Sequence, residues 1–188
     1  MKKYLTHNGN LIYRGNNHFV YRDYTPPVPS VQIGNQIWTS ENLSIDDGGV
    51  GIYTYDETTN PYGNLGIQKF YNHTAAVRIV NSIEGWHLPT KTEFETLLAY
   101  LATDQSLKLR STFGWVQGNG TNESNFNALP VGNISIGGSI ESLNRRICFW
   151  ALDNYGSGRW YCLRLDRSAV IGNESDSFAF SVRLVKDT

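Results

Sequence analysis

The chain has 188 residues, of which 40% are hydrophobic, 13% aromatic and only 18% charged. This suits one domain with a packed core and a small appendage. The net charge of −1 and the lack of a basic stripe argue against nucleic acid as a partner. No apolar run approaches the roughly 20 residues of a membrane-spanning helix, so we expect no membrane insertion and, in the chain as written, no signal peptide.

Residues 1–24 predict a short β segment of their own. Leu11–Arg14 and His18–Arg22 are strand-like, and Asn8-Gly9 favours a turn before them. Strands this short cannot bury a core, so we expect an attachment or oligomerisation segment, with a homotrimer as one arrangement that would suit it. Residues 25–30, with three prolines, predict a stiff spacer, and residues 31–188 form the main domain.

The main domain opens with a predicted β-hairpin around Gly34-Asn35. Residues 44–66 are polar and glycine-rich, which indicates an irregular surface region, and residues 69–77 predict a strand followed by a short helix. A second helix should begin after Thr90, because Glu93 lies three residues further on and completes a capping box. Its apolar face is given by the helical spacing of Phe94, Leu97, Leu98 and Leu101.

After residue 104 the pattern predicts short strands separated by Gly and Asn turns. They fall at residues 114–115, 126–130, 148–151, 160–163 and 178–185. In the last, Phe178, Phe180, Val182 and Leu184 alternate with smaller or polar residues, as in an antiparallel strand with one buried face.

The only cysteines, Cys148 and Cys162, both lie in apolar stretches. They suit buried thiols that act as small hydrophobic groups, or a disulfide between adjacent strands. A metal or catalytic pair is the third interpretation, although neither a His nor another Cys lies nearby in the sequence.

Several blocks of sequence together resemble the Fibrobacter succinogenes major paralogous domain. They are residues 33–38, 41–43, 85–90, 93–94, 127–132, 149–150 and 180–187, in the order of that family. The family is similar to the formylglycine-generating-enzyme branch of C-type-lectin folds. The resemblance therefore implies an α+β, C-type-lectin-like fold with a twisted antiparallel sheet, one or two helices and long loops, in which Trp86 and Trp150 belong to the scaffold.

Such domains also resemble the variable proteins of diversity-generating retroelements, including phage tail proteins that contact the host cell. In those proteins the variation lies on exposed C-terminal positions while buried residues stay fixed. The resemblance implies a receptor-binding adhesin on a virion or a bacterial cell surface. The alternative is a structural or attachment domain of the bacterial envelope, with a fixed protein or glycan ligand.

We expect neither catalysis nor a cofactor. The sulfatase-modifying relatives use two closely spaced cysteines that bind copper, whereas Cys148 and Cys162 are 14 residues apart. His87, between Trp86 and Leu88, is interpreted as a structural imidazole. The Glu-Pro-Asn and Gln-Pro-Asp triplets of calcium-dependent lectins do not occur, which argues against a calcium–sugar bridge. Residues 46–48 and 153–154 are therefore interpreted as solvated turns, with oxygen ligands of a structural ion as the alternative.

The candidate binding residues lie between the C-terminal core blocks and just before them. They are of the types that binding loops favour, because Tyr and Trp bring contact area with few rotors while Ser and Asn adapt their hydrogen bonds. Ordinary polar loops would have the same composition. The predicted ligand is a protein or glycan of a host cell surface, and the predicted ligand-binding residues are Asn144, Arg146, Asp153, Asn154, Tyr155, Ser157, Arg159, Trp160, Tyr161, Ser168 and Asn173.

Overall fold

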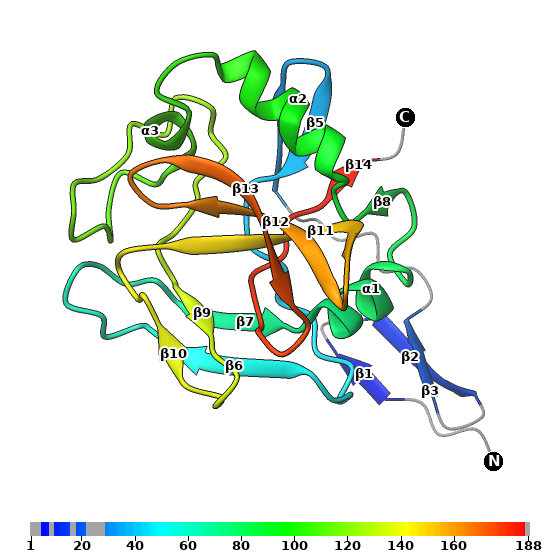
Figure 1. Cartoon of the computed structure of the whole chain (residues 1–188). Helices are drawn as coiled ribbons and strands as arrows, with labels where there is room; N and C mark the ends of the chain where they lie inside the picture. The colour runs from blue at the N-terminus through cyan, green and yellow to red at the C-terminus, as the bar shows by residue number, and fades with distance from the viewer. Residues whose placement is uncertain (1–4, 8–9, 16–17, 22–28, 187–188) are drawn as a thin grey trace.

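Antiparallel pairing of short strands organises the chain (Figure 1). The computed structural model describes residues 5–7, 10–15, 18–21 and 29–186, with side-chain surroundings for residues 29–186. Within these residues the strands and three short helices make an α+β structure, as expected. In the same part of the chain, no helix has the length and apolar character to cross a membrane.

Three strands make a separate small sheet in the N-terminal segment. They pair antiparallel in the order β1 (Leu5–His7), β2 (Asn10–Gly15) and β3 (His18–Tyr21). Strands therefore occur where the sequence pattern of residues 1–24 predicted them. The two turns and most of the proline-rich spacer lie outside the described residues, and the homotrimer stays a prediction.

The predicted hairpin at the start of the main domain is confirmed. Its strands are β4 (Ser30–Ile33) and β5 (Gln36–Thr39). Gly34 turns the chain with a φ of 62°, and a Cβ there would lie 2.9 Å from the Tyr100 ring, so both backbone and packing require glycine. A four-stranded sheet continues from β5 through β14 (Val185–Lys186) to β8 (Trp86–His87).

The sequence predicted an irregular region at residues 44–66, but part of this region forms a strand. β6 (Ile52–Asp56) pairs along its whole length with β7 (Ile67–Tyr71). Ile, Tyr and Thr are good strand residues, but the glycines before residue 52 and the turn residues after it obscured the short run. The prediction of a strand that runs into a helix is confirmed by β7 and α1 (His73–Val80).

The capping box of the second helix, α2 (Lys91–Leu101), is confirmed. The Thr90 hydroxyl accepts from the Glu93 backbone N–H at 3.2 Å, and the Glu93 carboxylate accepts from the Thr90 N–H at 2.7 Å. Three members of the predicted apolar face are buried, and Leu98 is half-buried. A third helix, α3 (Gln105–Leu109), was not predicted.

The three-stranded sheet that contains most of the predicted ligand-binding residues comes from the C-terminal third. After a two-stranded pair, β9 (Asn133–Ile134) and β10 (Ile140–Glu141), the chain forms β11 (Ile147–Gly156), β12 (Arg159–Leu165) and β13 (Ala169–Ser175). Side chains alternate between two covered faces. Phe149 and Leu163 join the core cluster that includes α2 residues, whereas Trp150 and Cys162 join the cluster that includes α1 residues. Figure 1 shows α2 on one side of this sheet and β6, β7 and α1 on the other.

Two predicted strands are wrong. Residues 114–115 and 126–130 form loops, although Trp115 and Phe126 are buried in the core. Isolated contacts hold these loops instead of an extended ladder: the Trp115 indole donates to the Ser111 hydroxyl at 3.1 Å, and Ala128 forms a single parallel bridge with Arg110. Burial of an aromatic residue was therefore mistaken for strand formation.

The prediction that residues 178–185 form one half-buried strand is also wrong. The segment touches several strands in turn: Ala179 bridges to Ile134, Phe180 to Tyr71, and Ser181 to Phe149. Residues 179–185 are buried on both sides, so the alternation of apolar residues does not mark a solvent-exposed face.

Arg183 lies at the centre of this segment and is 1% exposed. Its guanidinium donates to the backbone carbonyls of Thr39 (2.8 Å), Phe126 (2.7 Å) and Asn127 (3.1 Å). Its Nε also donates to the Asn42 side-chain oxygen at 2.8 Å. Burial lowers the pKa of Arg183 to about 9, which still leaves it charged at neutral pH.

Replacing this cation should destabilise the whole domain. We expect Arg183→Met to lower the free energy of unfolding by roughly 3–5 kcal/mol, because three buried carbonyls and an amide oxygen lose their donor. Urea unfolding measures the loss. Arg167→Met, at an exposed position, is the control and should change stability by less than about 0.5 kcal/mol. Equal stability of the two variants would contradict the role given to Arg183.

Candidate ligand-binding surface

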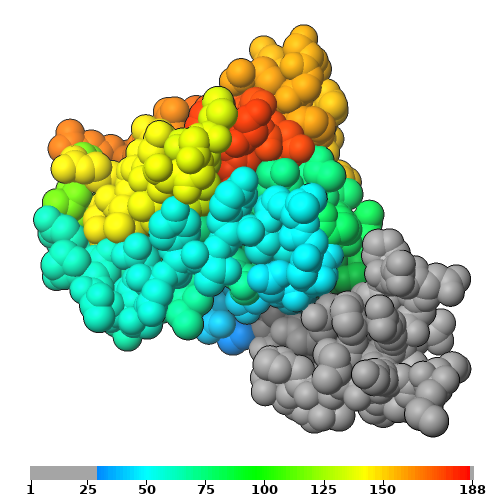
Figure 2. Space-filling model, turned by 90° about the horizontal axis from the view of Figure 1, so that it is seen from below, coloured from blue at the N-terminus to red at the C-terminus, as the bar shows by residue number. Residues whose placement is uncertain are grey.

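The β11–β12 hairpin is shaped by residues in the left-handed region. Gly156, Ser157 and Gly158 have φ values of 109°, 54° and 71°. The Asn154 side chain accepts from the Gly156 N–H, and the pairing of β11 with β12 shifts twice between Trp150 and Gly156. The shifts mark bulges, which bend the strand and increase its twist near the end of the hairpin. In Figure 2 this end stands out from the body in light orange.

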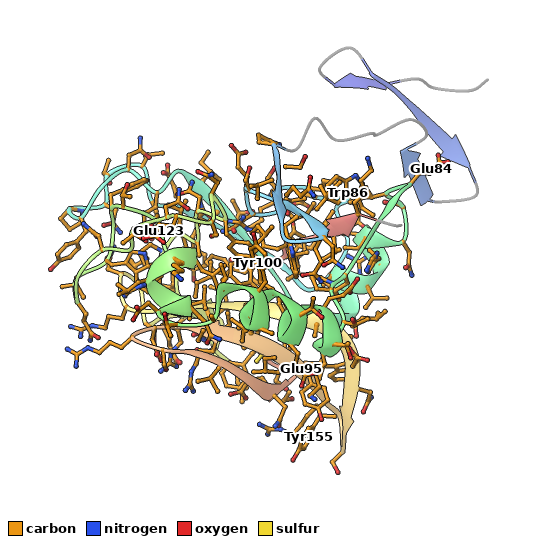
Figure 3. All side chains as sticks on the ribbon, turned by 90° about the horizontal axis from the view of Figure 1, so that it is seen from above. Glu84, Trp86, Glu95, Tyr100, Glu123 and Tyr155 are labelled. Carbon is orange, nitrogen blue, oxygen red and sulfur yellow. The ribbon has the colours of Figure 1, made fainter. Side chains whose placement is uncertain are left out.

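Two tyrosines and a lysine meet at the hairpin. Tyr155 is 54% exposed, and its ring packs edge-on against Tyr161 with centroids 5.3 Å apart. The Lys91 Nζ of α2 lies 5.4 Å from the Tyr161 ring centroid, which is a cation–π contact. The Asp153 carboxylate accepts from the Lys91 backbone N–H at the start of α2, so the hairpin is fixed to that helix. Figure 3 shows Tyr155 at the outer end of the hairpin, away from the body.

A second set of polar contacts fixes the neighbouring strand. The Arg159 guanidinium donates to the Asn173 backbone oxygen at 2.8 Å and to its side-chain oxygen. It also lies 3.4 Å from the Glu174 carboxylate. Arg159, Asn173 and Glu174 are therefore held in one arrangement before any ligand binds.

Seven of the eleven predicted residues lie together at this end of the sheet. We call them the hairpin surface: Asp153, Asn154, Tyr155, Ser157, Arg159, Tyr161 and Asn173. Each is at least partly exposed.

Two of the predicted residues, Asn144 and Trp160, make packing or hydrogen-bond contacts within the domain instead. Asn144 is 7% exposed, and its amide donates to the Gly114 carbonyl at 2.9 Å and exchanges hydrogen bonds with the Asn60 side chain. Trp160 lies on the other face of the sheet, where its ring stacks on His73 at 4.5 Å. Their composition suited a binding loop, but their contacts are those of packed residues.

The remaining two lie away from the hairpin surface. Ser168 belongs to the turn between β12 and β13, where its hydroxyl donates to Asp166 at 3.0 Å. Arg146 precedes β11, and its Nε lies 3.9 Å from the same Asp166 carboxylate. The structure thus divides the predicted site between opposite ends of one sheet.

The sequence analysis missed the contribution of α2. Lys91 and Glu95 form an ion pair at 2.5 Å, and that hydrogen bond raises the pKa of Lys91. Lys91 also borders Tyr161, 70 residues further along the chain. No local pattern connects these positions, because only the tertiary fold brings them together.

The two cysteines are free thiols in the cluster that includes Trp150. Burial raises the pKa of Cys148 well above its usual range and that of Cys162 to about 12, so both are protonated at neutral pH. His73 is likewise buried, which lowers its pKa, and its Nε2 contacts the Ala151 carbonyl at 2.9 Å. Among the residues with described side chains, no three His, Cys, Asp or Glu gather as metal ligands.

Comparison with known proteins identifies one relationship. The family model described as the Fibrobacter succinogenes major domain matches residues 31–186. Searches of curated proteins and of solved structures found no match.

The protonated state of the thiols can be tested directly. We expect Cys148 and Cys162 of the folded protein to react with a dithionitrobenzoate reagent at about pH 8 far more slowly than a free thiol, because only the thiolate attacks. Both should react promptly once the protein is unfolded in guanidinium. A fast reaction of either thiol in the folded protein would show that its pKa is not raised.

Proposed function

The chain belongs to the Fibrobacter succinogenes major domain family, and on that premise we propose that it is a ligand-binding protein that contacts a host cell-surface protein or glycan through the hairpin surface. The observation that carries the proposal is Tyr155, a large aromatic side chain that is 54% exposed on a fixed hairpin. Exposed tyrosines are typical anchors of binding surfaces, because they bury much area for little loss of conformational entropy.

The surroundings of Tyr155 support this proposal. Tyr161, Lys91 and Arg159 are already held by ring and hydrogen-bond contacts, so a ligand need not order them. The scaffold below is rigid: Trp150 is fully buried, and its indole donates to the Tyr71 carbonyl at 2.7 Å. The exposed positions can therefore change while the fold is kept.

We further propose that the domain has a C-type-lectin-like fold and is a diversified receptor-binding protein of a phage tail. What supports this is the separation of exposed hairpin residues from a buried framework that includes Trp150 and Phe180, whose tilted rings pack with centroids 4.3 Å apart. In a fixed attachment domain of a bacterial cell surface, by contrast, neither the exposed hairpin residues nor the buried framework would vary between copies of the gene.

An enzymatic role has less support. A nucleophilic cysteine needs a lowered pKa and a base beside it. Burial raises the pKa values of Cys148 and Cys162, which is the opposite of activation.

Diversification is tested by sequencing this gene in many isolates. Substitutions should concentrate at the codons of the hairpin surface, while Trp150 and Phe180 stay constant. Asn144 and Trp160 should also stay constant, because one is buried with internal hydrogen bonds and the other stacks on His73. Sparse variation spread evenly along the gene would instead favour a fixed attachment domain.

Binding by the hairpin surface is tested with a bacterial strain that retains the labelled wild-type protein. Tyr155→Ala should weaken retention about 30-fold, because a central aromatic anchor contributes about 2 kcal/mol. Tyr100→Ala is the matched control: Tyr100 is 64% exposed on α2 and lies well apart from Tyr155 (Figure 3). Both variants should unfold at the wild-type temperature. Equal retention of the two variants would remove Tyr155 from the binding site.

A further inference from the structure

A pocket of about 270 Å³ lies on the face of the β11–β12–β13 sheet opposite to Tyr161. The register places Cys148, Arg164 and Val170 in one row across this face, and Cys162 and Gly172 in the row that follows. Phe178 and Phe180 of the C-terminal segment and the β9–β10 pair complete the walls. Figure 2 shows this side of the molecule, where the β9–β10 region in yellow borders the C-terminal segment in red.

The pocket is open because β13 has a glycine at its centre. A Cβ added to Gly172 would meet nothing within 4 Å, and the backbone there has an ordinary φ. Gly172 is paired with Cys162, so its missing side chain would point to the same face, into the pocket. Glycine usually weakens a strand, and here it leaves room where most strand residues would fill it.

Three polar side chains that line the pocket form no hydrogen bond within residues 29–186. Asn133 is 5% exposed and lines the pocket, yet its side chain forms no hydrogen bond within the described part of the chain. The Nε atoms of Arg146 and Arg164 are shielded from solvent and also unbonded. A buried polar group without a partner is costly, and a bound ligand would supply one.

The charges in the pocket are separated along the strands. Arg146 and Arg164 lie 3.9 Å and 3.4 Å from the Asp166 carboxylate, and Glu141 lines the same pocket, so this end is marked by the N–H donors of two guanidinium groups and not by an excess of charge. Glu174 lies four residues beyond Val170, about 13 Å along β13, and is paired with Arg159.

We propose that this pocket binds a sugar residue that carries a carboxylate. The carboxylate would pair with the guanidinium groups of Arg146 and Arg164, which are suited to planar anions. The hydroxyls would donate to Glu174 and bond to the Asn133 amide, and an apolar face of the ring would lie on Phe178. The volume suits one sugar residue. Asn173 of the hairpin surface also borders the pocket, but the proposal does not rest on the function proposed for that surface.

The test is calorimetric titration and ligand-observed NMR of the full chain with D-glucuronate and N-acetylneuraminate. D-glucose and N-acetylglucosamine serve as neutral counterparts. At least one acidic sugar should bind with a Kd of about 10 mM or lower and at least about tenfold more tightly than its neutral counterpart, with weaker binding at high salt. No binding of either acid, or equal binding of the neutral sugars, would overturn the proposal.

Two variants and one control locate the site. Gly172→Leu should abolish acidic-sugar binding by filling the pocket, with a thermal unfolding curve like that of the wild type. Arg164→Gln should weaken binding about tenfold or more, because the charge-assisted bond is lost. Arg167→Gln, at an exposed position outside the pocket lining, should bind as the wild type does. Unchanged binding by a folded Gly172→Leu protein would exclude this pocket.

The source of the sugar is distinguished by a third ligand. Oligogalacturonate presents the same chemistry as a chain, so tighter binding of the oligomer than of D-galacturonate would indicate a polysaccharide on a cell surface. Equal affinity would indicate that a free acidic sugar is sufficient, because the pocket then gains nothing from neighbouring residues.

Discussion

The buried cation of Arg183 is the constraint on which the rest of the domain depends. Its four hydrogen bonds reach β5, the residues just after it and the loop at residues 126–127. Its guanidinium also lies over the ring of Phe126 at 4.6 Å. Phe126 in turn packs edge-on against Phe149, which is a residue of β11. Among residues 29–186 no carboxylate forms an ion pair with Arg183. Its charge is tolerated there because the donors meet fixed carbonyl dipoles, and those carbonyls need this donor in return. The C-terminal segment is thus an internal support and not an edge strand.

The sequence predicted best what depends on adjacent residues. The capping box at Thr90 and the hairpin at Gly34 follow from local hydrogen bonds and backbone freedom, and both are confirmed. It predicted poorly where burial comes from distant segments. The alternation in residues 178–185 could not show that its polar positions, Ser181 and Arg183, are also buried, because their partners are distant in the sequence. The hydrogen-bond partners of the Arg183 side chain, for example, are 56 to 144 residues away. The short strand β6 was hidden for a related reason, since its partner and not its flanks stabilises it.

Amino-acid composition was the basis for choosing the candidate surface, but composition alone did not separate its exposed residues from its packed ones. Asn and Trp occur both in binding loops and in packed positions, so Asn144 and Trp160 were grouped with residues such as Tyr155, whose side chain is exposed. The pocket on the face of the sheet opposite to Tyr161 was missed because its lining residues come from separate segments and form no motif in the sequence. Only the pairing of Cys162 with Gly172 shows that a glycine faces a buried thiol and leaves a space between two arginines and a glutamate.

The β12–β13 ladder has a mechanical consequence. It runs from the pair Arg159–Ser175, beside the hairpin surface, to the pair Leu165–Ala169, next to the exposed turn at the opposite end of the sheet. A pull on the tip along β12 would act lengthwise on this strand, and its hydrogen bonds lie across that direction. The bonds would then be sheared together and would share the force, whereas a perpendicular pull would open them one after another. A load applied at this tip would therefore be carried by β12, the strand that contains Arg159 and Tyr161.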